Sequence, residues 1–271
     1  MRYIVLGHTG FVGKNLTKYL SNEGHEVVGL SRVQCDLRDY AQLNIQMKAA
    51  GQVDAIFNCA ANVGSVHYVT AFAGDVISDN TYIALNLYKA ILENCPSTTV
   101  VNLLSNCCYV DGTQIQEEET WLAGEVHTSV FSFGNFKRVL YYISKCYEMQ
   151  YDIKSVNLMF SGIYGPGGKP IREWIYIDDV CNILLQSAQK EKIIEPVNIA
   201  QGKGFAISET AGNIAKAIGY EGELTFNTDY QDGAPIKILG MGRSKDIFKD
   251  YVFYDHQEGV RQTVEYYKEI L

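Results

Sequence analysis

The sequence predicts an α/β fold, in which a doubly wound parallel sheet carries a small C-terminal lobe. Short apolar runs rich in valine, isoleucine and leucine alternate with longer stretches whose apolar residues recur at helical spacing. A glycine-rich turn joins the first apolar run to the first helical stretch. The length of 271 residues suits one large domain with such a lobe, and the 47% hydrophobic residues can fill an ample core.

The first strand is predicted at Tyr3–Leu6, and a helix follows the turn Gly7–Gly13. Three glycines permit a tight turn, a close approach of the backbone to a pyrophosphate, and close packing of the helix on the strand. The phosphates then lie at the positive N-terminus of the helix. This arrangement predicts a Rossmann dinucleotide site, whose candidate contacts are Gly7, Thr9, Gly10, Phe11, Val12 and Gly13.

The second predicted strand, Glu26–Leu30, leads to Arg32, where an NAD-preferring fold usually places a carboxylate. An arginine suits a 2′-phosphate, so we expect NADP (NADPH) as cofactor, with NAD less favoured. The alternative is a solvated arginine at a strand end. Asp36 and Leu37 are predicted to end a third short strand, from which Asp36 could accept a hydrogen bond from the adenine amino group.

The next predicted strand, Val53–Asn58, runs into Cys59, Ala60 and Ala61, small residues that let the backbone touch the ribose of the cofactor. A helix bearing Asn80 follows after a loop, and Asn80 is a further candidate at the cofactor site. Its apolar residues recur at helical spacing.

A buried strand at Val100–Leu104 delivers Ser105 to its carboxyl end, where open parallel sheets bind their ligands. A helix is predicted from Asn135 to Gln150, with Lys137 in its first turn. Ser105, Phe133 and Lys137 have the spacing of a Ser…Tyr-x-x-x-Lys reductase site in which phenylalanine stands in place of the tyrosine. The alternative for Ser105 is a residue that caps a strand end.

The remaining predicted elements complete the sheet and build the lobe. They are a strand at Val156–Phe160, a helix introduced by Glu173–Asp179, a closing strand at Val197–Ala200, a helix from Ser208 to Ile218 capped by Ser208 and ended by Gly219, and a terminal helix near Gln257. We expect residues 1–162 with 173–200 to form the Rossmann domain, and residues 163–172 with 201–271 to form the lobe.

Composition excludes several classes of partner. A formal net charge of −8 without a basic run argues against nucleic-acid binding. No apolar run reaches the length of a membrane span, and the chain enters a strand pattern without a signal peptide, so we expect a cytoplasmic protein. Seven cysteines without a C-x-x-C pair make a metal site improbable.

These residues together resemble the extended short-chain dehydrogenase/reductase family of nucleotide-sugar enzymes, also called the NAD-dependent epimerase/dehydratase family. The chain is most similar to its GDP-L-fucose synthase-like reductases. The resemblance runs nearly end to end and includes the glycine turn, Ala60–Gly64, the helix with Asn80, Ser105–Tyr109, Tyr164–Pro166, Arg172–Asp179 and Asp232–Lys237. The last of these motifs is the most specific to the subgroup.

The resemblance implies an NADP-dependent oxidoreductase that acts at C4 of a GDP-linked, or otherwise nucleotide-linked, 4-keto-6-deoxy sugar. Ser105 would hydrogen-bond the sugar oxygen, and Lys137 would bind the nicotinamide ribose and hold down the pKa of a neighbouring phenol. Asn80 would support an active-site water or the backbone. Arg172 and Lys237 would contact the nucleotide diphosphate, although either could be a solvated surface residue.

Two further implications concern activity and assembly. Cys107 matches a family cysteine that serves as acid/base, so a bifunctional 3,5-epimerase/4-reductase is the alternative enzyme; the thiol could equally be packing alone. The helices bearing Asn80 and Lys137 commonly pair two subunits in the family, which predicts a homodimer. A non-catalytic nucleotide-binding sensor or scaffold is the alternative from another class.

The chain departs from the family pattern in three ways. Phe133 keeps the shape of the family's tyrosine but has no proton to give, so we interpret the chain as an impaired Tyr-to-Phe variant, engineered rather than natural. Several tens of family residues are missing between Gly167 and Lys169; the gap is either natural or an omission from the sequence, and the matches on both sides favour the second. No histidine obviously replaces the one that the family pairs with the cysteine.

Overall fold

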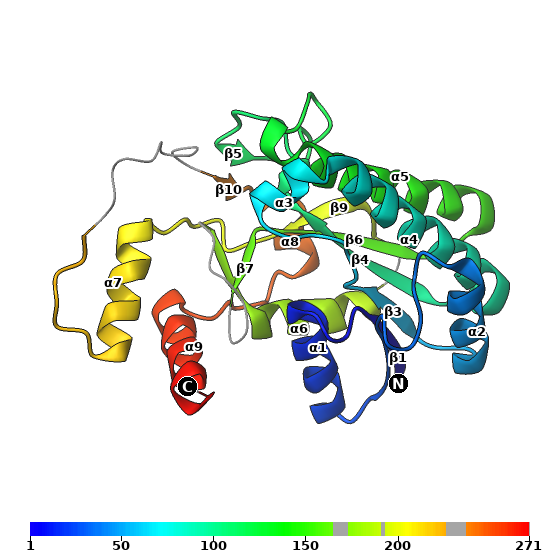
Figure 1. Cartoon of the computed structure of the whole chain (residues 1–271), viewed down its shortest axis with the longest axis horizontal. Coiled ribbons are helices and arrows are strands. Elements are labelled where there is room, and N and C mark those ends of the chain that lie inside the picture. The colour runs from blue at the N-terminus through cyan, green and yellow to red at the C-terminus, as the bar shows by residue number, and fades with distance from the viewer. Residues whose placement is uncertain (165–172, 191–192, 226–236, 271) are drawn as a thin grey trace.

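The computed structural model describes residues 1–164, 173–190, 193–225 and 237–270. Its centre is a six-stranded, wholly parallel sheet in the order β2-β1-β3-β4-β6-β9 (Figure 1). The strands are β1 (Arg2–Leu6), β2 (Glu26–Leu30), β3 (Ala55–Asn58), β4 (Thr99–Ser105), β6 (Ser155–Phe160) and β9 (Ile193–Ile199). The predicted doubly wound parallel sheet is confirmed.

Helices cover both faces of the sheet (Figure 1), and each face has its own apolar cluster. One face carries α2 (Tyr40–Ala50), α4 (Ala73–Asn94) and α5 (Phe131–Tyr151). The other carries α1 (Phe11–Asn22) and α6 (Ile177–Ala188). The short α3 (Val66–Ala71) precedes α4, and two 3-10 turns, η1 (Asn106–Cys108) and η2 (Thr128–Val130), flank the approach to α5. The strand runs are apolar because both faces are covered.

Smaller elements extend beyond the sheet (Figure 1). They are the strand pairs β5 (Ile115–Gln116) with β10 (Ile238–Leu239) and β7 (Gly162–Tyr164) with β8 (Trp174–Tyr176), and the helices α7 (Ile207–Ile218), α8 (Gly242–Ile247) and α9 (His256–Ile270).

Three buried carboxylates tie the C-terminal elements to the rest of the molecule. Glu118 accepts backbone N–H groups from Asn198 and Arg243, both at 2.7 Å. Glu173 accepts from the backbone of Leu239 at 2.8 Å. Asp179 accepts the hydroxyl of Tyr251 at 2.7 Å and the backbone N–H of Tyr254 at 3.1 Å. Burial raises the pKa of Glu173 to about 7 and that of Asp179 to about 6.

A row of asparagines crosses the middle of the sheet. Asn58, Asn102 and Asn157 are register partners on β3, β4 and β6. The amide of Asn58 donates to Asn102 at 3.2 Å, and that of Asn102 donates to Asn157 at 3.1 Å and to the hydroxyl of Tyr88 at 2.7 Å. Asn157 continues the row to Ser144 of α5 at 3.1 Å. The amides therefore bond to one another across the core, whereas the side-chain oxygen of Asn58 has no hydrogen-bond partner among the described residues.

Several local expectations were wrong. Asp36 and Leu37 do not form a strand, because side chains of α2 and α4 hold their backbone. The helix of Lys137 begins at Phe131, so Phe133 is also helical and Lys137 lies in the second turn. Ala206, not Ser208, is the N-cap of α7, and it makes no side-chain cap; Gly219 does end this helix, with φ 77°.

The sequence runs continuously from Gly167 through Gly168 to Lys169 between β7 and β8, and the expected omission there stays a prediction. Residues 165–172 themselves lie outside the described residues.

Candidate active site

The glycine turn forms a close-fitting cradle at the carboxyl end of β1. Gly7 has φ 72°, and a Cβ on it would lie 2.9 Å from the Cα of Ala60. A Cβ on Gly13 would lie 2.2 Å from the carbonyl oxygen of Gly7. Side chains at these two positions would fill the space beside the N-terminus of α1, where Phe11 and Val12 begin the helix. The turn therefore fits a pyrophosphate, which needs bare backbone and a helix N-terminus.

A pocket of about 290 Å³ opens beside this cradle. Nine of the residues predicted at the cofactor line it, namely Gly7, Thr9, Gly10, Arg32, Asp36, Leu37, Cys59, Ala60 and Ala61. The structure adds residues that we did not predict, namely Ser31, Val33, Arg38, Asn62, Asp79 and Ile83. Phe11, Val12 and Gly13 do not line the pocket, since they lie in α1, and they support the turn from behind.

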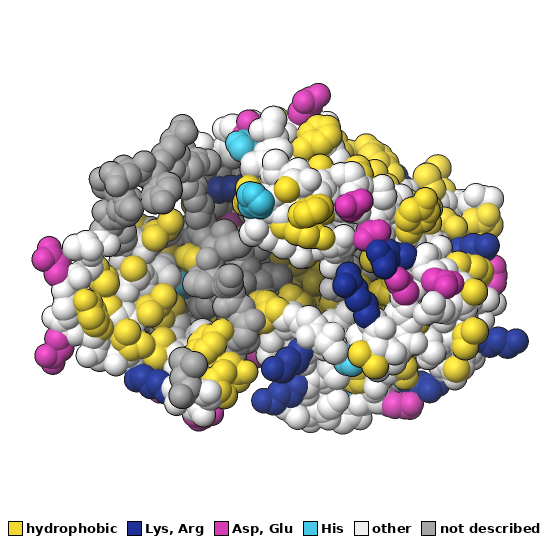
Figure 2. All heavy atoms as spheres, in the orientation of Figure 1, with side chains coloured by type: hydrophobic (Ala, Val, Ile, Leu, Met, Phe, Trp, Pro, Cys, Tyr) yellow, Lys and Arg dark blue, Asp and Glu magenta, His cyan; other side chains and the backbone are white. Residues whose placement is uncertain are grey.

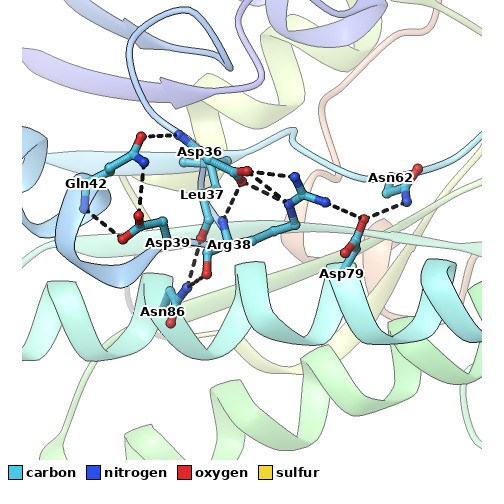
Figure 3. A network of polar contacts seen from close by, with 8 residues as sticks. All are labelled: Asp36, Leu37, Arg38, Asp39, Gln42, Asn62, Asp79 and Asn86. Carbon is cyan, nitrogen blue, oxygen red and sulfur yellow. Dashed lines mark hydrogen bonds and ion pairs between the residues drawn. The ribbon is translucent and has the colours of Figure 1, made fainter.

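The carboxylate of Asp36 is already engaged. The guanidinium of Arg38 contacts both of its oxygens, at 3.0 and 2.7 Å, and reaches Asp79 of α4 at 3.0 Å (Figure 3). The arginine holds the pKa of Asp36 at about 2, well below its usual range. The Asp-x-Arg spacing could have indicated this pair from the sequence alone, but no local pattern joined Arg38 to Asp79 of α4.

Asn80 supports the pocket without lining it. Its side chain is fully buried, accepts the backbone N–H of Asn62 at 2.7 Å and donates to the carbonyl of Asn62 at 2.8 Å. Asn62 in turn donates its side-chain amide to Asp79 at 3.0 Å. Asn80 therefore fixes the loop after β3, and of the two predicted roles the structure favours backbone support.

Ser105 and Cys107 lie together at the carboxyl end of β4. Ser105 is the last residue of the strand, and its Oγ accepts the backbone N–H of Cys107 at 3.3 Å. Both side chains are partly exposed. Helix α5 approaches this turn so closely that a Cβ on Gly134 would lie 2.4 Å from the carbonyl oxygen of Cys107. The glycine thus brings Phe133 and Lys137 toward Ser105.

Lys137 is buried at the same edge of the sheet. Its Nζ donates to the carbonyl of Leu103 at 2.6 Å and lies 5.2 Å from the centroid of the Phe133 ring. Burial lowers the pKa of Lys137 to about 8, against the opposing influence of neighbouring cysteine thiols that include Cys59. Cys59 itself lines the cofactor pocket.

Phe133 is partly buried and packs against the core cluster beneath α4 and α5. The ring occupies the helix position four residues before Lys137 and presents no polar atom to the site. Two further residues, Arg172 and Lys237, are the predicted contacts of the nucleotide diphosphate. Arg172 lies outside the described residues, and Lys237 is half-buried immediately before β10.

Comparison with known proteins decides the family. The model of the NAD dependent epimerase/dehydratase family matches residues 3–170. The chain belongs to this family. The match covers the glycine turn, the pocket and the Ser105 to Lys137 region. The family therefore accounts for the cradle, the parallel sheet and the placement of Ser105 at a strand end.

Individual relatives are more distant. A probable GDP-L-fucose synthase 1 of Oryza sativa subsp. japonica is 22% identical over 305 residues, covering 99% of this chain and 92% of that protein. The solved GDP-mannoheptose C4 reductase of Campylobacter jejuni with NADP bound has a TM-score of 0.86 at 20% identity and covers 98% of both chains. The GDP-L-fucose synthetase of Naegleria fowleri bound to NADP has a TM-score of 0.87 at 20% identity, over 99% of this chain and 92% of that one. These structures share the fold.

The described residues include neither a membrane-spanning helix nor a cluster of metal ligands. None of the helices in the described ranges is both long and apolar enough to cross a bilayer. Within the same ranges, no three histidine, cysteine, aspartate or glutamate side chains gather as metal ligands would. Acidic and basic side chains alternate on the face shown in Figure 2, without a large area of one sign.

Proposed function

We propose that the protein is an NADP-dependent oxidoreductase that acts at C4 of a nucleotide-linked 4-keto-6-deoxy sugar or a related sugar, with GDP as the preferred nucleotide. The observation that carries the proposal is that the cofactor pocket and Ser105 lie at the carboxyl ends of adjacent parallel strands. Gly7 follows β1, Cys59 follows β3 and Ser105 ends β4, in the sheet order β1-β3-β4, and Lys137 donates to Leu103 of β4. The names of the relatives support the nucleotide and the cofactor.

Different residues bind the cofactor and polarise the sugar oxygen. The cradle Gly7–Gly13 holds the pyrophosphate of the cofactor, and Arg32 receives the 2′-phosphate. When bound, the nicotinamide supplies a hydride for the carbonyl carbon of the sugar. Ser105 hydrogen-bonds the sugar oxygen. Lys137 uses one N–H to fix itself on Leu103 and directs its remaining donors to the ribose.

Because position 133 is a phenylalanine, protonation of the sugar oxygen becomes the difficult step of the reaction. A reduced carbonyl oxygen must receive a proton, and a positioned acid contributes about 10²- to 10⁴-fold to such a step. Phenylalanine cannot supply it, whereas the ring can still pack against the core. We therefore propose that ligand binding is retained and that turnover is impaired.

Phe133→Tyr tests this proposal. We expect it to raise the rate of NADPH oxidation in the presence of a GDP-linked 4-keto sugar by about 10²-fold or more, because the added phenol faces the Lys137 ammonium. Phe131→Tyr is the matched control, since Phe131 is an exposed residue of the same helix and should leave the rate unchanged. No gain with Phe133→Tyr, in a variant that binds NADPH, would refute the proposed chemistry.

A bifunctional 3,5-epimerase/4-reductase is the second candidate enzyme, and the partly exposed thiol of Cys107 beside Ser105 favours it. Among the described residues no histidine is hydrogen-bonded to Cys107, so the thiol has no evident second group. Solvent deuterium at C3 and C5 of the recovered sugar would indicate epimerisation, and Cys107→Ser should abolish that exchange. Unlabelled sugar with the unaltered protein would rule out this candidate.

The candidate from another class is a nucleotide-binding sensor or scaffold, which the absent phenol of Phe133 favours. Such a protein would bind the cofactor and lack a nucleotide-sugar site. Titration calorimetry with GDP in the presence of NADPH separates the two. Binding that weakens in Lys237→Ala supports the enzyme, and the absence of GDP binding supports the sensor.

A further inference from the structure

The outer wall of the cofactor pocket is formed by a charged cluster that we call the Arg38 clamp, defined by Asp36, Arg38 and Asp79. The guanidinium lies between the two carboxylates. Its Nε and Nη2 contact Asp36 at 3.0 and 2.7 Å, and its Nη1 contacts Asp79 at 3.0 Å (Figure 3). The clamp thereby joins the segment after β2 to helix α4.

The backbone beneath the clamp is fixed independently of the arginine side chain. The side-chain amide of Asn86 donates to the carbonyls of Leu37 and Arg38 at 3.0 and 2.8 Å. The side chain of Gln42 accepts the backbone N–H of Asp36 at 3.0 Å (Figure 3). Removal of the guanidinium should therefore change the charge of the wall and leave its path largely intact.

The charged side chains that line the pocket sum to zero only because Arg38 is among them. Two arginines, Arg32 and Arg38, face two carboxylates, Asp36 and Asp79, on the lining of one pocket. The ion pairs occupy Arg38, whereas Arg32 makes no hydrogen bond or ion pair within the described ranges of the chain. Without Arg38, one positive charge would face two negative charges where a phosphate is expected to bind.

The 2′-phosphate of NADP carries about two negative charges at neutral pH, and NAD lacks it. Uncompensated carboxylates nearby would repel the phosphate and would affect NAD much less. The side chains of Arg38, Asp36 and Asp79 are 43%, 38% and 23% exposed, so salt should screen this repulsion.

We propose that Arg38 is a specificity-determining residue for the cofactor, because it neutralises Asp36 and Asp79 and so leaves the charge of Arg32 available to the 2′-phosphate. The inference rests on the proposed function, since it requires a dinucleotide in this pocket. Neither the sequence pattern nor the family match assigns this role to Arg38.

The test compares the affinities for NADPH and NADH, measured by fluorescence titration. We expect Arg38→Met to weaken NADPH binding about tenfold, which corresponds to about 1.4 kcal/mol, and to change NADH binding less than about threefold. Asp79→Asn should strengthen NADPH binding and leave NADH binding unchanged. In the double variant, Asp79→Asn should recover part of the loss, because one repelling charge is gone.

Arg261→Met is the matched control. Arg261 on α9 also pairs with two carboxylates, Glu258 and Glu265, so the substitution removes an equivalent clamp outside the pocket lining and should alter neither affinity. Equal weakening of NADPH and NADH by Arg38→Met would overturn the inference, as would a double variant that recovers nothing. If the unaltered protein binds neither dinucleotide, the proposed function itself fails.

Discussion

At the scale of single residues, the candidate site depends on two small side chains or groups that are absent, a Cβ at Gly134 and a hydroxyl at Phe133. Gly134 has no Cβ, and only for that reason can α5 approach the turn that carries Cys107. Phe133 has no hydroxyl, and that atom is the one the proposed reductase site lacks. Sequence spacing predicted that Ser105, Phe133 and Lys137 act together, which stays a prediction, and it could not show how closely Gly134 packs.

Gly134→Ala should destabilise the protein by about 1–3 kcal/mol and weaken cofactor binding, because the added methyl would lie 2.4 Å from the Cys107 carbonyl and must displace backbone. The free energy of urea unfolding measures the effect. Gly212→Ala is the matched control on α7, where a Cβ meets nothing within 4 Å. That control should stabilise by up to about 1 kcal/mol. Equal effects at the two glycines would contradict the close approach of α5.

At the scale of elements, the sequence predicted what local patterns determine. The strands β1, β4 and β6 were evident from apolar runs, and the glycine turn placed α1. The segment at Asp36 and Leu37 was misread as a strand, since its backbone is held by Asn86, which lies 49 residues from Leu37 in the sequence. The Arg38 clamp was missed for the same reason, because Asp79 is 41 residues from its partner.

The asparagine row ties three of these strands together. Asn102→Leu should cost on the order of 3 kcal/mol, because it removes the acceptor of the Asn58 amide and the amide that donates to Asn157 and Tyr88 inside the core. Thermal and urea unfolding measure the loss. Asn22→Leu at the exposed end of α1 should change stability by less than about 0.5 kcal/mol. A loss no larger at Asn102 than at Asn22 would show that the row contributes nothing.

At the scale of the whole molecule, buried carboxylates hold the C-terminal elements in place. Glu173 is the clearest case, because burial outweighs its backbone hydrogen bonds and raises its pKa to about 7. The folded state therefore binds a proton that the unfolded state releases near pH 4.5. This contribution to stability is full at low pH and is lost as pH rises from about 4.5 to about 7.

Glu173→Gln should expose this linkage. At pH 5 both folded proteins carry a neutral side chain at this position, so the unaltered protein still has most of the stability that its bound proton contributes. Above pH 7 the unaltered protein must hold a buried carboxylate, so the variant should gain in relative stability between pH 5 and pH 8. The midpoints of urea unfolding at the two pH values give the comparison. A difference that is independent of pH would contradict a raised pKa.

The asparagine row also has a consequence for how the chain reaches its native state. Parallel strands pair across long sequence separations and can slip in register, and a slip of one residue turns every side chain to the opposite face. In this sheet such a slip would bury Asn58, Asn102 or Asn157 against aliphatic neighbours without a partner. The row thus penalises misaligned pairing during folding. Replacing all three with leucine should permit slipped pairings, which would be seen as slower refolding and a larger aggregated fraction after dilution from urea.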